Sequence, residues 1–87
     1  MGRYIIAYDI TDNRRRVKVS SILENEGLRL QKSLFIIDVA PLRITGIANK
    51  LSILLRDNDL LLMTPICGMC MDKAAYYGPG PLVSLMA

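Results

Sequence analysis

A buried strand that ends in a carboxylate and leads at once into a basic helix constrains this chain more than any other feature. Residues 3–10 carry a run of β-favouring and small apolar side chains, which is typical of a buried strand. Asp9 stands near the end of that strand, and Asp12 follows three positions later. Thr11 or Asp12 is well suited to cap a helix over 12–26, but capping does not explain Asp9. A charged residue at the end of an apolar strand needs a reason of its own.

Three arginines follow the two carboxylates, and this combination suits phosphodiester chemistry. Aspartate oxygens are hard ligands of the kind that Mg²⁺ or Mn²⁺ prefers, and arginine binds phosphate oxygens through paired hydrogen bonds. Asp9 is the candidate metal ligand and catalytic residue, with a structural bond to the following turn as the alternative. The basic side chains of this segment that could bind nucleic acid are Arg14, Arg15, Arg16 and Lys18, of which Arg16 and Lys18 are preferred. A solvated helix face is the competing interpretation of this basic run.

The composition predicts one small cytoplasmic domain that pairs with a second copy. A chain of 87 residues lies near the lower limit for an adequate core, yet 52% of its residues are hydrophobic. No apolar run approaches the roughly 20 residues that a bilayer span needs, and there is no signal-peptide layout. We therefore expect no membrane association, and a homodimer that buries the excess apolar surface. Most of the 11 basic residues lie within the first 33 positions, which indicates a surface for nucleic acid.

The absence of histidine narrows the chemistry further. It excludes serine–histidine and cysteine–histidine catalysis as well as histidine-ligated zinc. The two cysteines, Cys67 and Cys70, form a single CxxC pair, which is two ligands short of a structural zinc site. Two thiols packing a turn are the simplest interpretation, and zinc pooled across a dimer or a redox pair are the alternatives.

The order of strand and helix patterns predicts an α+β fold. The expected elements are strands at 3–10, 28–33, 34–39 and 60–66, helices at 12–26 and 42–56, and a short added strand at 74–77. This order is the ferredoxin-like βαββαβ arrangement, with both helices on one face of an antiparallel sheet. The other sheet face would be apolar and bare in a monomer, so we expect two sheets to pair face to face.

Several other residues have weaker or supporting roles in this interpretation. Arg29 lies on the second strand, which the ferredoxin-like order separates from the first, so it is a weaker candidate for nucleic-acid binding. Phe35 is interpreted as core rather than as a platform for base stacking. Ser33 and Asp12 are supporting residues, the first through its hydroxyl and the second as a helix cap. Tyr8 alternates with Asp9 and should point to the opposite sheet face.

Four segments of the sequence resemble the CRISPR-associated Cas2 family. They are the strand end at 8–12, the basic helix start at 14–18, the glycine and glutamine-x-serine-x-phenylalanine stretch at 27–35, and the last core strand with its cysteine-bearing turn at 59–70. Together they cover about residues 3–78 in the family's order and spacing. The segment after Gly78 is short, and the stretch at 39–44 is more apolar than the family's acidic opening of the second helix.

The resemblance implies a ferredoxin-like domain over 1–78 and a tail at 79–87 that contacts the partner protomer. It places Asp9 on the family's metal-ligand aspartate, facing its symmetry mate, so that two chains share one Mg²⁺ or Mn²⁺ ion. The implied activity is metal-dependent endonuclease cleavage of single-stranded RNA or duplex DNA, in CRISPR adaptation beside the Cas1 integrase.

Two other functions compete with the nuclease. One is a non-catalytic scaffold that holds duplex DNA for the integrase through sequence-independent phosphate contacts. The other is a toxin-like ribonuclease of related fold that acts outside CRISPR.

Overall fold

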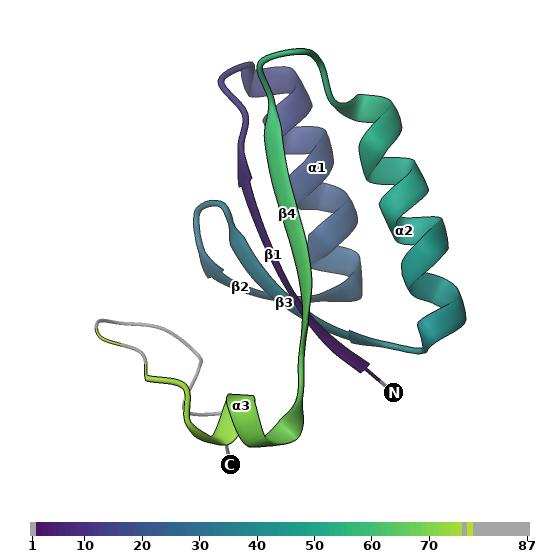
Figure 1. Ribbon diagram of the computed structural model, residues 1–87. Coiled ribbons are helices and arrows are strands. Elements are labelled where there is room, and N and C mark those ends of the chain that lie inside the picture. The colour runs from purple at the N-terminus through teal and green to yellow at the C-terminus, as the bar shows by residue number, and fades with distance from the viewer. Residues whose placement is uncertain (1, 76, 78–87) are drawn as a thin grey trace.

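The computed structural model describes residues 2–75 and 77, and its strands and helices follow the predicted order. The elements are β1 (Gly2–Asp9), α1 (Asn13–Glu26), β2 (Gly27–Gln31), β3 (Leu34–Val39), α2 (Pro41–Leu54), β4 (Leu60–Ile66) and α3 (Gly68–Asp72). The four strands form one antiparallel sheet in the order β2-β3-β1-β4 (Figure 1). In the described part of the chain, no helix is long and apolar enough to cross a membrane.

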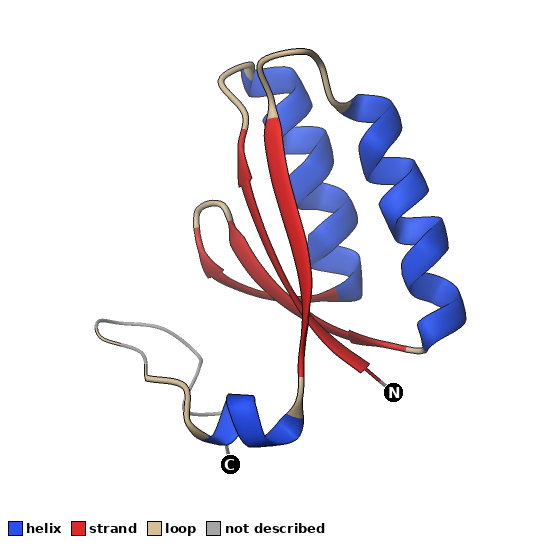
Figure 2. Cartoon of the chain, viewed as in Figure 1, coloured by secondary structure: helices blue, strands red, loops and turns tan. Residues whose placement is uncertain are grey.

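Helices α1 and α2 lie side by side and cover one face of the sheet, as the ferredoxin-like prediction requires (Figure 2). The core between these layers is apolar and closed to solvent. Its most deeply buried side chains are Ile6, Phe35 and Ile37 from the sheet, and Val19, Leu23 and Leu51 from the helices. Phe35 is therefore a core residue, as predicted.

Local sequence signals fix where the helices begin. The Asp12 carboxylate accepts a hydrogen bond from the Arg15 backbone N–H at 2.9 Å, which confirms Asp12 as the N-cap of α1. Pro41 occupies the first turn of α2, where its missing N–H leaves no intrahelical bond unmade. Gly27 ends α1 and begins β2 directly, and a side chain there would clash with the Ile36 carbonyl oxygen.

The chain after β4 departs from the prediction. Instead of a cysteine-bearing turn and a strand at 74–77, it forms the short helix α3, and Ala74, Ala75 and Tyr77 belong to no strand. The side chain of Cys67 caps the start of this helix, and a thiol is not among the side chains usually found at an N-cap. Residue 76 and the predicted tail at 79–87 lie outside the described residues.

The second face of the sheet is partly covered rather than bare. Met71 of α3 is 2% exposed and packs against Ile36, beside other apolar residues of this face, namely Ile5, Leu28, Leu30 and Ile66. On the edge strand β4, Leu60 and Leu62 remain 68% and 60% exposed. We call this second side of the sheet the open face.

Candidate nucleic-acid interface and metal-binding aspartate

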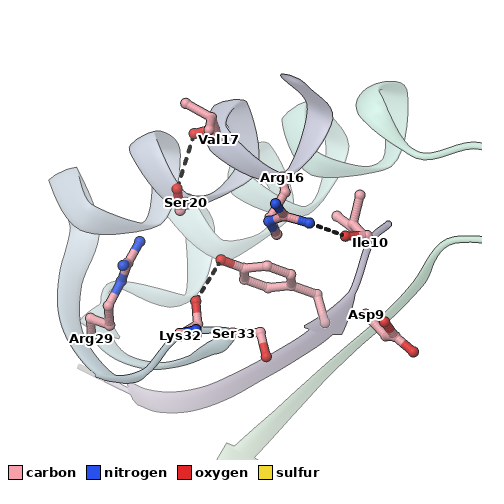
Figure 3. A pocket seen from close by; sticks show the side chains of 9 residues that line it. Asp9, Ile10, Arg16, Val17, Ser20, Arg29, Lys32 and Ser33 are labelled. Atoms are coloured by element: carbon pink, nitrogen blue, oxygen red, sulfur yellow. Dashed lines mark hydrogen bonds between the residues drawn. The ribbon is translucent and has the colours of Figure 1, made fainter. Parts of the chain in front are cut away.

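Asp9 and Tyr8, neighbours at the end of β1, point to opposite sides of the sheet. Tyr8 is 5% exposed and belongs to the core under the helices, whereas Asp9 is exposed. Asp9 pairs in register with Leu60 of β4 and therefore shares the open face with it. Figure 3 shows the Asp9 carboxylate directed away from the basic side chains around it. This arrangement confirms the prediction that the two neighbouring residues face apart.

The Asp9 carboxylate is available to a ligand. Within residues 2–75 and 77 it takes part in no hydrogen bond or ion pair. The described residues therefore give no support to the alternative in which Asp9 bonds the turn that follows it. A shallow apolar depression of about 440 Å³ lies beside the carboxylate and includes Leu60 and Leu62 in its lining.

Tyr8 fastens the turn between β2 and β3 to the end of β1. Its hydroxyl donates to the Lys32 carbonyl oxygen at 3.2 Å, and its backbone N–H donates to the Ser33 carbonyl oxygen at 3.1 Å. The ring stacks on Phe35 with centroids 6.3 Å apart. Burial raises the pKa of the Tyr8 hydroxyl, against the opposing charge of Arg29, so the hydroxyl stays protonated and donates at neutral pH. Ser33 thus contributes through its carbonyl oxygen to the site.

The hydrogen bonds from Tyr8 hold the β2–β3 turn next to the end of β1, and a basic hollow of about 660 Å³ lies between them beside Asp9 (Figure 3). Three cationic side chains line it: Arg16 from α1, Arg29 from β2 and Lys32 from the β2–β3 turn. The hollow is open to solvent and carries the positive charge that phosphate groups favour. We call these three residues the basic rim.

Arg16 holds the loop that follows Asp9. Its guanidinium donates to the carbonyl oxygens of Ile10 at 3.1 Å and Thr11 at 3.3 Å, and to Asn13 Oδ1 at 2.7 Å. These bonds use part of the donor set of Arg16 and fix the backbone between β1 and α1. Arg16 therefore shapes the site besides lending it charge.

Arg29 reaches the hollow although its strand is not adjacent to β1. The order of strands is as predicted, but the β2–β3 turn folds back onto Tyr8 and brings the side chain with it. The guanidinium carbon lies 5.2 Å from the centre of the Phe35 ring, and Nη2 donates to Glu24 at 2.8 Å. Strand order alone therefore does not keep Arg29 away from the hollow beside Asp9, and its binding of nucleic acid stays a prediction.

The sequence predicts that Arg15 binds phosphate, but in the structure its guanidinium binds a carboxylate of the same chain. Its Nε and Nη2 donate to Asp59 Oδ2 and Oδ1 at 2.8 and 3.1 Å, and Asp59 also accepts from the Arg56 backbone N–H at 2.9 Å. The Asp59 side chain is 1% exposed. The Arg15 guanidinium lowers the pKa of Asp59, and the ion pair joins the start of α1 to the loop before β4. Arg14 and Lys18 are exposed on α1 and do not line the hollow.

Sequence reasoning missed two residues of this region. Lys32 is a cation in a hairpin turn, and only the pairing of β2 with β3 shows that this turn returns to β1. Asp59 carries no local signal of its role, because its partner Arg15 lies 44 positions away. The signal for both lies in tertiary contact rather than in local pattern.

One chain alone supplies few metal ligands. Asp9 offers a single carboxylate, and no group of three or more cysteine, aspartate or glutamate residues that could hold a metal occurs in the described part of the chain. Its exposed oxygens are the hard donors that Mg²⁺ prefers, and a second copy placed on the open face would supply another carboxylate. The residues present therefore fit a metal shared between two chains better than one held by each.

Comparison with known proteins decides the family. The sequence model described as CRISPR associated protein Cas2 matches residues 1–74. The chain belongs to the Cas2 family. A CRISPR-associated endoribonuclease Cas2 of Synechocystis is 34% identical over 83 residues, which span 94% of this chain and 90% of that protein.

Two solved structures share the fold of this chain. A hypothetical protein from Thermus thermophilus is 31% identical and superposes with a TM-score of 0.81, over 92% of this chain and 94% of that one. A chain of a partial Cas6-RT-Cas1–Cas2 complex is 22% identical and superposes with a TM-score of 0.77, over 88% and 91% of the two chains. This second likeness concerns the fold alone.

Proposed function

We propose that this Cas2-family chain is a metal-dependent endonuclease that acts as a homodimer, with Asp9 of each chain as ligand of a shared Mg²⁺ ion. The observation that carries the proposal is the position of Asp9. Its carboxylate is exposed, has no partner among the described residues, and lies between the basic rim and the open face. The name endoribonuclease of the Synechocystis relative supports a nuclease, with RNA as the first substrate to test.

In this proposal some residues of the chain supply charge to the site, and others hold the site in place. A bound Mg²⁺ ion polarises a phosphate and lowers the pKa of a water molecule. Asp9 supplies the charge that holds such an ion, and Arg16 keeps the loop behind Asp9 in place. Arg29 and Lys32, which line the hollow beside Asp9, offer donors to phosphate groups of a bound strand.

A second copy of the chain is the partner that the open face fits. Leu60 and Leu62 are largely exposed on the same face as Asp9, and large apolar side chains in such a cluster favour burial against another protein surface. A two-fold axis near Asp9 would cover these leucines and bring the two carboxylates together. The dimer thus completes the metal site.

A scaffold function in CRISPR adaptation is the second candidate. The basic rim can hold duplex DNA through phosphate contacts that do not need Asp9. The chain of similar fold in a Cas1–Cas2 complex supports Cas1 as a protein partner. Under this alternative the chain would bind DNA and assist integration without cutting.

The Asp9→Asn variant tests the nuclease proposal. The amide keeps the size of the side chain but removes the negative charge, so Mg²⁺-dependent cleavage of single-stranded RNA or duplex DNA should fall by at least about 100-fold. Binding of the same nucleic acid should persist or tighten slightly, because the basic rim is intact and a repulsive charge is gone.

Asp57→Asn is the matched control, since Asp57 is an exposed carboxylate in the loop before β4. It should leave cleavage unchanged. Magnesium-dependent cleavage that survives in Asp9→Asn would refute the metal-site role of Asp9. Wild-type protein that does not cleave, combined with normal Cas1-dependent integration by Asp9→Asn, would favour the scaffold.

A further inference from the structure

The two cysteines face each other across the first turn of α3. Cys67 is the N-cap of the helix, and its Sγ accepts a hydrogen bond from the Cys70 backbone N–H at 3.3 Å. An N-cap side chain bends back over the third helical residue, and here that residue is Cys70. Met71, 2% exposed against Ile36, anchors the helix on the open face and holds this arrangement in place.

The spacing of the pair suits a disulfide. Residues three apart on a helical turn have Cβ atoms about 5–6 Å apart, and a disulfide needs about 3.5–4.5 Å. Cys67 lies outside the helix with an extended backbone, so this helical spacing does not set the position of its Cβ, and its Sγ already accepts a hydrogen bond from the Cys70 N–H at 3.3 Å. Both cysteines are free and exposed, and thus reachable by a reagent in solution.

The two thiols differ in chemistry. Hydrogen bonds from the Cys70 backbone N–H and thiol favour the thiolate of Cys67 and lower its pKa, while the same interaction raises the pKa of the Cys70 thiol. The thiolate is the form that attacks a disulfide. Cys67 is therefore the better nucleophile of the pair. Once Cys67 carries a mixed disulfide, Cys70 is close enough to attack the Cys67 sulfur.

A hollow gives a small molecule access to Cys67. It has a volume of about 490 Å³ and lies between the start of β1, the end of β4 and the start of α3. Cys67 lines it together with the ion-paired side chains of Arg3 and Asp38. A small disulfide entering this space would meet Cys67 first, because Cys70 is not among the residues that line it.

We propose that Cys67 and Cys70 are a redox-active pair that forms a reversible intramolecular disulfide by exchange with a small-molecule disulfide such as glutathione disulfide. The Cys67 thiolate attacks one sulfur of the reagent, forms a mixed disulfide and releases one small thiolate. Cys70 then attacks the Cys67 sulfur and releases the second small thiolate. The two cysteines lose two electrons and two protons, and the reagent is reduced to two thiols.

The experiment exposes the purified full chain to glutathione buffers of defined ratio, quenches the exchange with acid, alkylates the free thiols and weighs the products by mass spectrometry. The wild type should become a form lighter by two hydrogens and carry no glutathione at the end point. Cys70→Ser should accumulate glutathione on Cys67, because no second thiol resolves it. Cys67→Ser should react several-fold more slowly at Cys70, and serine in its place remains a good N-cap that keeps α3 folded.

Four results would overturn the proposal. The first is a stable glutathione adduct on the wild type, and the second is an equal reaction rate in the two single variants. The third is a disulfide that joins two chains instead of closing within one. The fourth is a pair of thiols that resists alkylation until a chelator is added, which would indicate a metal shared between two CxxC pairs.

Discussion

Adjacent side chains on β1 have separate tasks because strand residues alternate between faces. Tyr8 points under the helices and binds the β2–β3 turn with both its hydroxyl and its backbone N–H. Asp9 points to the open face and has no partner among the described residues. The first residue builds the basic hollow, and the second is free for a metal ion.

The pair formed by Arg15 and Asp59 makes stability depend on pH. Asp59 has a folded pKa below its ordinary value of 3.8, so it contributes stability when ionised, and this contribution is lost as the pH falls through the folded pKa. Asp59→Asn should therefore unfold more easily than the wild type at pH 7. The difference should stay constant down to about pH 4 and shrink below it.

Urea unfolding of both proteins between pH 7 and pH 2.5 measures this difference, with Asp57→Asn as the control that should follow the wild type throughout. A stability difference between wild type and Asp59→Asn that grows as the pH falls below 4 would mean that the ion pair is not its source.

At the level of elements, the β2–β3 hairpin determines which cations reach the site. Its turn lies against Tyr8, and this contact carries Arg29 and Lys32 to the same hollow as Arg16. Of the four basic residues at the start of α1, only Arg16 lines the hollow. Arg15 binds Asp59 instead, and Arg14 and Lys18 are not among the lining residues.

Lys32→Ala should weaken nucleic-acid binding by a similar factor for every sequence, because it removes a phosphate contact and no base contact. The slope of log affinity against log salt should fall in magnitude by about 1. Fluorescence anisotropy of labelled single-stranded RNA and duplex DNA over a salt series measures both quantities. Lys50→Ala, an exposed lysine on α2, is the matched control, and an equal loss in that variant would argue against a local interface.

For the whole molecule, local patterns were sufficient to predict the fold but not the site. The strand at 60–66 and the start of α1 at its Asp12 cap match the structure because caps and apolar runs act over a few residues. The helix α3 and the place of Lys32 in the hollow beside Asp9 were not predicted. The first depends on a thiol acting as a cap, and the second on contacts between distant segments.

The sequence pattern singles out Asp9, because a charged residue at the end of an apolar strand conflicts with the local pattern, and such conflicts mark candidate functional positions. The role of Asp9 as a metal ligand stays a prediction. The sequence also predicted a second copy, and the exposed Leu60 and Leu62 beside Asp9 are the structural counterpart of that prediction. The proposed metal ion, the proposed dimer and the role of Asp9 therefore depend on one another and are tested together.

The stoichiometry of bound Mn²⁺, measured by electron paramagnetic resonance during titration of the purified protein, tests this hypothesis most directly. Two Asp9 carboxylates that share an ion across a two-fold axis predict about one Mn²⁺ per two chains, and no such site in Asp9→Asn. One ion per chain, or the same binding in Asp9→Asn as in the wild type, would contradict it.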